Sequence, residues 1–266
     1  MLNYYSQHGE DYILDIIFSD IGCGYFVEVG CIDGLRFSNT LTFAERGWKG
    51  MCVEAHSDYI EVLKENRPES VVCHCAAAEE NADNVSFYAN DRGSLSTLDK
   101  TREEEFRENY GEYFSGFEKQ SVSKRRLDSL FEEHNAPNKI DILSIDVEGN
   151  EVEALKGMSF KKFRPRVLVI ESDSKSHEIS LDKLLIPEGY IKEFRIRQNI
   201  FYFENKNLPK KVEKNMYVAD ITHTPHPLDG GESKTKEIEI NLYRYNVRSK
   251  IKRKIKKIYS CLESKL

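Results

Sequence analysis

Short apolar runs alternate with amphipathic segments over most of this chain, and this alternation limits the fold more than any other feature. The runs end in polar or glycine-rich turns and occupy residues 25–29, 50–53, 71–75, 140–145 and 166–170. Segments with helical spacing lie between them, at residues 40–46, 58–66, 127–133 and 152–156. Short apolar runs are typical of strands buried on both faces, and strand–helix alternation places such strands in a parallel sheet. The sequence therefore predicts an α/β, doubly wound fold.

The chain after the fifth predicted strand indicates how the sheet ends. A helix is expected at residues 181–186, and strands at 190–194 and 199–203 are close enough in sequence to pair antiparallel. They complete a mostly parallel, seven-stranded sheet with a reversed edge strand. The composition changes at Pro209, so we expect a core domain over residues 1–208 and an extension over residues 209–266. Residues 81–122 interrupt the alternation and are a candidate substrate lid.

Charge and hydropathy limit the partners and the location of the protein. The formal net charge of −6 argues against a general nucleic-acid binder, because such binding needs many basic contacts. No secretory leader is recognised, and no uncharged apolar run approaches the roughly 18 residues of a membrane span. We therefore expect a cytoplasmic protein.

The end of the sequence has a different character from the rest. From Arg248 to Leu266, isoleucines recur at helical spacing and lysines crowd the remaining positions, which predicts a basic amphipathic helix. Such a helix can lie on an anionic membrane surface, dock on an acidic partner, or pack back onto its own acidic domain. A peripheral membrane contact through this segment is one of these three expectations.

The turn after the first predicted strand is a candidate cofactor site. Ligands of open α/β sheets bind at the carboxyl ends of the strands, where Gly30 lets the backbone turn and approach a ligand closely. Glu28 and Asp33 would repel a pyrophosphate but attract the ammonium group of S-adenosylmethionine. Glu54 ends the second strand, where a carboxylate can accept hydrogen bonds from both ribose hydroxyls of an adenosine cofactor. Glu54 fits NAD equally well, although the sequence lacks the GxGxxG pattern of that cofactor.

Several separate blocks of the sequence resemble the FkbM family of methyltransferases. The blocks run in the family's order over about residues 6–204, and they are Ser6-Gln7-His8-Gly9-Glu10-Asp11, Val27-Glu28-Val29-Gly30, Ser38-Asn39-Thr40, Gly47-Trp48-Lys49-Gly50, Arg126-Leu127-Asp128-Ser129-Leu130 and Ile145-Asp146-Val147-Glu148-Gly149-Asn150-Glu151. The resemblance implies a class I methyltransferase fold that binds S-adenosylmethionine. By position it implies these cofactor contacts: Gln7, Glu28, Gly30, Asp33, Asn39, Glu54, Ala76, Ala77 and Asp146.

Acidic residues at the ends of the fourth and fifth predicted strands are the candidates for the chemistry. Methyl transfer to oxygen requires an aligned acceptor that loses a proton. Asp146, Glu148 or Glu171 can take that proton as a general base. Alternatively, Asp146, Glu171 and Asp173 can hold Mg²⁺, which would bind the acceptor oxygen and lower its pKa. The sequence leaves both mechanisms open.

Two further residues near these strand ends have ordinary interpretations. Glu151 is expected to be a charge in the first turn of a helix, and His177 a solvated loop histidine.

The sequence thus predicts an S-adenosylmethionine-dependent O-methyltransferase. The resemblance and the basic tail favour a sugar hydroxyl, in a glycan or a glycolipid precursor, over another small-molecule acceptor. Two alternatives remain open at this point: an NAD-dependent oxidoreductase on the same fold, and a noncatalytic adapter that binds the cofactor without turnover.

Overall fold

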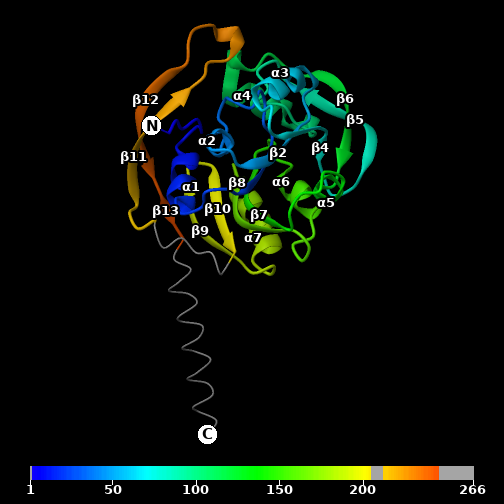
Figure 1. Ribbon diagram of the computed structural model, residues 1–266. Helices are drawn as coiled ribbons and strands as arrows, with labels where there is room; N and C mark the ends of the chain where they lie inside the picture. The colour runs from blue at the N-terminus through cyan, green and yellow to red at the C-terminus, as the bar shows by residue number, and fades with distance from the viewer. Residues whose placement is uncertain (1, 205–211, 246–266) are drawn as a thin grey trace, which may run out of the picture.

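The computed structural model describes residues 2–204 and 212–245, and its centre is an eight-stranded sheet (Figure 1). Five strands run parallel, and the rest join antiparallel after the fifth. In sheet order the strands are β3 (Val71–His74), β2 (Lys49–Glu54), β1 (Tyr25–Val29), β7 (Lys139–Ile145), β8 (Arg164–Glu171), β10 (Asn199–Glu204), β9 (Tyr190–Ile196) and β13 (Tyr243–Arg244). This topology confirms the predicted doubly wound fold. The sheet has one strand more than expected because β13 adds to its edge.

Helices cover both faces of this sheet because alternate strand residues point to opposite sides. Side chains of α5 (Leu127–Glu133), α6 (Glu151–Lys156) and α7 (Lys175–Leu185) share one apolar cluster with Val27 and Leu143. The cluster on the other face contains Phe26 and Ile142, and its helices are α1 (Glu10–Phe18), α2 (Leu41–Glu45) and α3 (Ile60–Asn66), the last preceded by the turn η1 (Ser57–Tyr59). The sheet is therefore buried between two helical layers.

The segment that interrupts the alternation builds a small sheet of its own. Its strands, in the order β4-β6-β5, are β4 (Ala76–Ala77), β6 (Glu118–Arg125) and β5 (Ala82–Ala89). Between β5 and β6 the chain forms η2 (Lys100–Arg102), α4 (Glu103–Tyr110) and η3 (Gly111–Tyr113). Phe106, Phe114 and Leu95 give this segment a separate apolar cluster. The segment therefore has a small apolar cluster of its own.

The described part of the extension packs against the core. A two-stranded ribbon of β11 (Met216–His223) and β12 (Lys234–Asn241), joined through η5 (Pro227–Asp229), lies beside α1 (Figure 1). Ile221 and Ile240 of this ribbon share an apolar cluster with Ile13. The division at residue 208 stays a prediction.

The predicted basic helix from Arg248 to Leu266 lies outside the described residues, so its membrane contact stays a prediction. Among the helices of the described ranges, none combines the length and the apolar character needed to cross a membrane.

Candidate functional site

A cavity of about 380 Å³ opens at the carboxyl ends of the parallel strands, where ligands of doubly wound sheets bind. Most residues predicted for the cofactor and for the chemistry line it, although they come from separate parts of the chain: Gln7, Glu28, Gly30, Asn39, Glu54, Ala76, Ala77, Asp146, Glu148 and Glu171. The predicted residues Asp33 and Asp173 do not line it.

Gly30 brings the backbones of β1 and β7 together at the floor of the cavity. Its φ is +86°, and a Cβ built there would lie 1.7 Å from the carbonyl oxygen of Asp146. The Gly30 amide donates to the Val53 carbonyl at 2.9 Å, and the Asp146 amide donates to the Val29 carbonyl at 3.0 Å. Only glycine fits this turn, because any side chain would collide with backbone that cannot rotate away.

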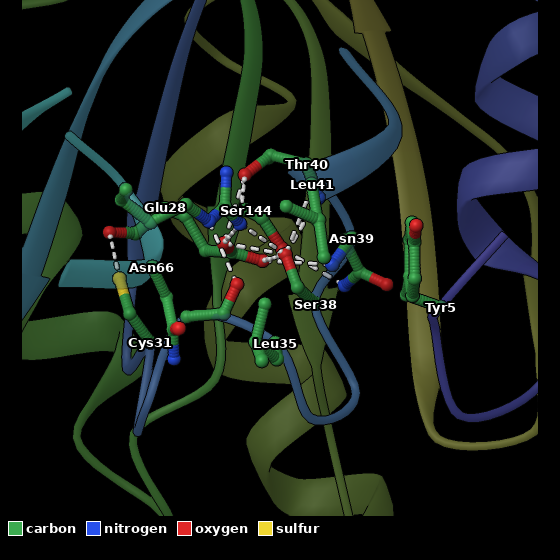
Figure 2. A network of polar contacts seen from close by, with 12 residues as sticks. Tyr5, Glu28, Cys31, Leu35, Ser38, Asn39, Thr40, Leu41, Asn66 and Ser144 are labelled. Atoms are coloured by element: carbon green, nitrogen blue, oxygen red, sulfur yellow. Dashed lines mark hydrogen bonds and ion pairs between the residues drawn. The ribbon is translucent and has the colours of Figure 1, made fainter. Parts of the chain in front are cut away.

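Glu28 is the centre of a buried polar network (Figure 2). Its carboxylate accepts hydrogen bonds from the Asn39 amide at 2.7 Å and the Thr40 hydroxyl at 2.8 Å. Ser38 Oγ donates to it at 2.8 Å, and Arg67 Nη2 lies 3.0 Å from Glu28 Oε2. These protein groups already neutralise the Glu28 carboxylate, so it attracts the ammonium group of a ligand less than the sequence suggested. Glu28 lines the cavity but chiefly fixes the segment that carries Asn39.

We expect Arg67→Ala to destabilise the protein strongly. The Arg67 side chain is fully buried, and its loss would leave the Glu28 carboxylate without a counter-charge, which typically costs about 3–5 kcal/mol. Urea unfolding followed by circular dichroism measures the change in the free energy of unfolding. Lys49→Ala is the control, because Lys49 pairs with Glu69 and both side chains are mostly exposed. Loss of this exposed ion pair should lower the free energy of unfolding by only about 0–1 kcal/mol. Equal effects of the two substitutions would contradict this role of Arg67.

Asp33, a predicted cofactor contact, does not line the cavity and faces a neighbouring arginine. Arg36 Nε lies 2.7 Å from Asp33 Oδ2 in a buried ion pair. The other carboxylate oxygen accepts the amides of Leu35 and Arg36 at 3.0 and 2.9 Å. Asp33 therefore holds the turn after Gly30 in shape.

Glu54 has the placement expected of a ribose-binding carboxylate. It is buried at the end of β2, where its two oxygens accept the amides of Ile32 and His56, each at 2.7 Å. Burial raises the pKa of Glu54, and its backbone hydrogen bonds oppose that shift. Beside it, Ala76 and Ala77 form a wall of small side chains.

Three acids from two strand ends meet on the cavity wall. Asp146, Glu148 and Glu171 each place a carboxylate oxygen within 4.8 Å of the others, close enough to hold a metal ion together. The surrounding protein weakens their hydration and, with nearby acids, raises the pKa of Asp146 to about 6. The pKa values of Glu148 and Glu171 are raised well above the usual range for the same reasons. The cluster therefore binds protons more tightly than free carboxylic acids do.

The predicted metal ligand Asp173 lies outside this cluster. Its carboxylate pairs with Arg102 Nη2 at 2.6 Å, and the same guanidinium has Nη1 3.8 Å from Glu148. Arg102 thus links the inserted segment to the ends of β7 and β8. Among the described residues the third acid beside Asp146 and Glu171 is Glu148, whereas a metal at either set of acids stays a prediction.

Glu151 has a role that sequence reasoning missed. It is fully buried, and its Oε1 accepts the amides of Val147 and Gly149, each at 3.1 Å. Glu148, between these amides, has a φ of +54°, which is unusual for a residue with a side chain. His177 Nε2 lies 3.2 Å from the second oxygen of Glu151, so His177 is no solvated loop residue. The glycine after Glu148 was the one available signal of a tight turn.

Glu151→Ala is expected to loosen the turn that carries Asp146 and Glu148. It leaves two part-buried amides without an acceptor, at up to about 1–3 kcal/mol each. Glu151→Gln keeps a side-chain oxygen for both amides and should retain most of the stability. Thermal unfolding of the two variants makes the comparison. If glutamine destabilises the protein as much as alanine, the two hydrogen bonds are not what matters.

The inserted segment reaches the cavity, as expected for residues 81–122. Ser94, Leu95 and Ser96 line it, together with Tyr110 and Tyr113. The Thr97 hydroxyl donates to the Glu148 carbonyl at 3.1 Å and so joins the segment to the acid cluster. Movement of this segment as a lid stays a prediction.

Solved methyltransferase structures resemble the chain at low identity. A precorrin-6y C5,15-methyltransferase from Geobacter metallireducens is 9% identical, with 90% of this chain and 87% of that chain covered and a TM-score of 0.41. An O-methyltransferase from Bacillus cereus, in complex with SAH, is 12% identical (91% and 84% covered, TM-score 0.38). TrmK from M. capricolum, in complex with S-adenosyl-homocysteine, is 9% identical (73% and 68%, TM-score 0.36). No curated protein matches the sequence.

The family comparison confirms the resemblance seen in the sequence blocks. The model described as "Methyltransferase FkbM domain" matches residues 23–193, which is more than half of the chain. The match spans β1 to β9 and includes the turn at Gly30, the inserted segment and all three acids of the cluster. The chain therefore belongs to the FkbM family and is an S-adenosylmethionine-dependent methyltransferase.

Proposed function

We propose that this methyltransferase acts on oxygen, and that its acceptor is a sugar hydroxyl in a glycan or a glycolipid precursor. The observation that carries the proposal is the cluster of Asp146, Glu148 and Glu171 on the cavity wall. A hydroxyl is a weak nucleophile until its proton is removed, and a carboxylate with a raised pKa is suited to removing it.

The residues present fit S-adenosylmethionine. The turn at Gly30 has no room for a side chain, so backbone forms the floor where a ligand would lie. Glu54 would hold the ribose hydroxyls, and Ala76 and Ala77 would leave room for the adenine ring. Asn39 is held near this floor, since its Nδ2 donates to Ser144 Oγ at 3.0 Å. When bound, the cofactor supplies an electrophilic methyl group on sulfur.

Asp146 is the proposed general base. Its pKa of about 6 leaves the carboxylate mostly ionised at neutral pH and still basic enough to accept a proton. It lies at the end of β7, directly across from Gly30, so an acceptor hydroxyl beside the cofactor would be within its reach. The pKa values of Glu148 and Glu171 are raised well above the usual range, and a hydrogen bond with Glu171 lowers the pKa of Asp146.

The same three acids suggest a second way to activate the hydroxyl. Asp146, Glu148 and Glu171 would be oxygen ligands for Mg²⁺, which would lower the pKa of a bound hydroxyl. Activity measured after treatment with EDTA separates the two mechanisms. The general-base proposal expects unchanged activity, and loss of activity restored by Mg²⁺ would support the metal.

The function is tested by transfer of a radiolabelled methyl group from S-adenosylmethionine to a panel of oligosaccharides and cell-derived glycolipids. Mass spectrometry of the products should show an added methylene mass on a sugar ring. Calorimetry with each cofactor should show that the protein binds S-adenosylmethionine and does not bind NAD. Binding without transfer to any acceptor would overturn the proposal in favour of a noncatalytic adapter.

A further inference from the structure

Three aromatic side chains line the cavity and yet remain accessible to water. Tyr110 is 44% exposed, Tyr113 is 43% exposed and Phe37 is 37% exposed. The two tyrosines come from the inserted segment, at the end of α4 and in η3. Exposed aromatic surface inside a binding cavity is suited to contact with a ligand, because covering it removes apolar area from water.

Tyr110 lies on the side of the cavity where the chemistry is expected. Glu148 and Glu171 are close enough for their negative charges to contribute to the raised pKa of Tyr110, after the larger effect of burial. An acceptor that presents a hydroxyl to the acid cluster would therefore lie next to this ring.

Tyr113 is held in place before any ligand arrives. The Arg92 guanidinium lies 3.9 Å from the centre of the Tyr113 ring. Arg92 Nη1 is in turn 2.7 Å from Asp229, in the loop of the extension that joins β11 and β12. A ring fixed from one face loses little conformational freedom when a ligand covers its other face.

We infer that Tyr110 and Tyr113 form the acceptor subsite, as a platform for a pyranose ring; this inference rests on the proposed function. The C–H face of a pyranose is apolar and stacks on an aromatic ring, while its hydroxyls point outward from the rim. The cavity supplies hydrogen-bonding partners for such a rim in Asn150, Ser94 and the acid cluster. A planar phenol has one hydroxyl and would leave most of these groups without a partner.

Saturation-transfer NMR tests the platform with methyl glycosides of common hexoses and deoxyhexoses, in the presence of saturating S-adenosylhomocysteine. p-Cresol is the competing phenol. The variants are Tyr110→Ala and Tyr113→Ala, each with a phenylalanine counterpart that keeps the ring. Tyr243→Ala is the matched control, because Tyr243 is an exposed tyrosine on β13 that does not line the cavity.

We expect the ring C–H protons of at least one glycoside to receive saturation from the wild-type protein. Each alanine variant should weaken glycoside binding about tenfold, whereas the phenylalanine variants and Tyr243→Ala should bind as the wild type does. Equal glycoside signals in the wild type and the alanine variants would overturn the subsite. So would p-cresol binding without any glycoside binding.

The methyl-transfer assay keeps this inference separate from the proposed function. Transfer to a sugar that both alanine variants leave unchanged would overturn the subsite and preserve the function. Glycoside binding that depends on the tyrosines, without transfer to any sugar, would overturn the function and preserve the platform.

Discussion

Gly30→Ala is expected to reduce methyl transfer by about 100-fold or more, because the added Cβ would displace backbone at the floor of the site. That Cβ would lie 1.7 Å from the Asp146 carbonyl oxygen, and relief requires β1 and β7 to separate. Such a shift moves the cofactor floor and the proposed base together. Titration calorimetry should show weaker S-adenosylmethionine binding, while circular dichroism should show a folded protein.

Gly47→Ala is the control that measures the effect of a positive φ alone, without a steric clash. Gly47 has a φ of +83°, close to that of Gly30, but a Cβ there would meet no atom within 4 Å. It should lower stability by about 1 kcal/mol and leave cofactor affinity unchanged. If Gly30→Ala binds S-adenosylmethionine as tightly as Gly47→Ala does, the close approach of β1 and β7 is unimportant for the site.

Asp146→Asn is expected to lower kcat by about 10²–10⁴-fold, the range typical for loss of a general base. Wild-type activity should fall as the pH drops through about 6, since protonated Asp146 cannot accept the acceptor's proton. The asparagine variant should lose that dependence on pH. Rates measured under saturating S-adenosylmethionine across this pH range test both statements.

Asp173→Asn is the matched control for this acid. Asp173 pairs with Arg102 outside the cluster. The Asp173→Asn variant should therefore keep a pH dependence of activity close to that of the wild type. An Asp146→Asn variant that retains wild-type kcat would contradict the assignment of the base. Strong loss of activity from Asp173→Asn, restored by Mg²⁺, would instead favour the metal set first predicted from the sequence.

The sequence was most informative where burial determines residue type. The predicted strand at residues 25–29 coincides with β1, because a strand covered by helices on both faces is mostly apolar, with Glu28 as the exception in β1. The same reasoning located β7 and β8 to within two residues at each end. Gly30 and Glu54 follow from the general rule that ligands bind at strand ends, and the structure places both in the cavity.

Pairing between distant side chains could not be predicted in this way. Asp33 and Asp173 were reasonable ligands by position, but each faces an arginine whose direction depends on the folded backbone. Glu151 looked like an ordinary helix-start acid until its two amide partners were seen. β13 is two residues long and has no sequence pattern that predicts its pairing with β9.

The small sheet of β4, β5 and β6 shares no strand with the large central sheet. Mutations that reshape the segment between β5 and β6 therefore need not disturb the strand register that sets Gly30 against Asp146. Under the proposed function, the acceptor subsite on that segment could change while the cofactor contacts at Gly30 and Glu54 stay in place.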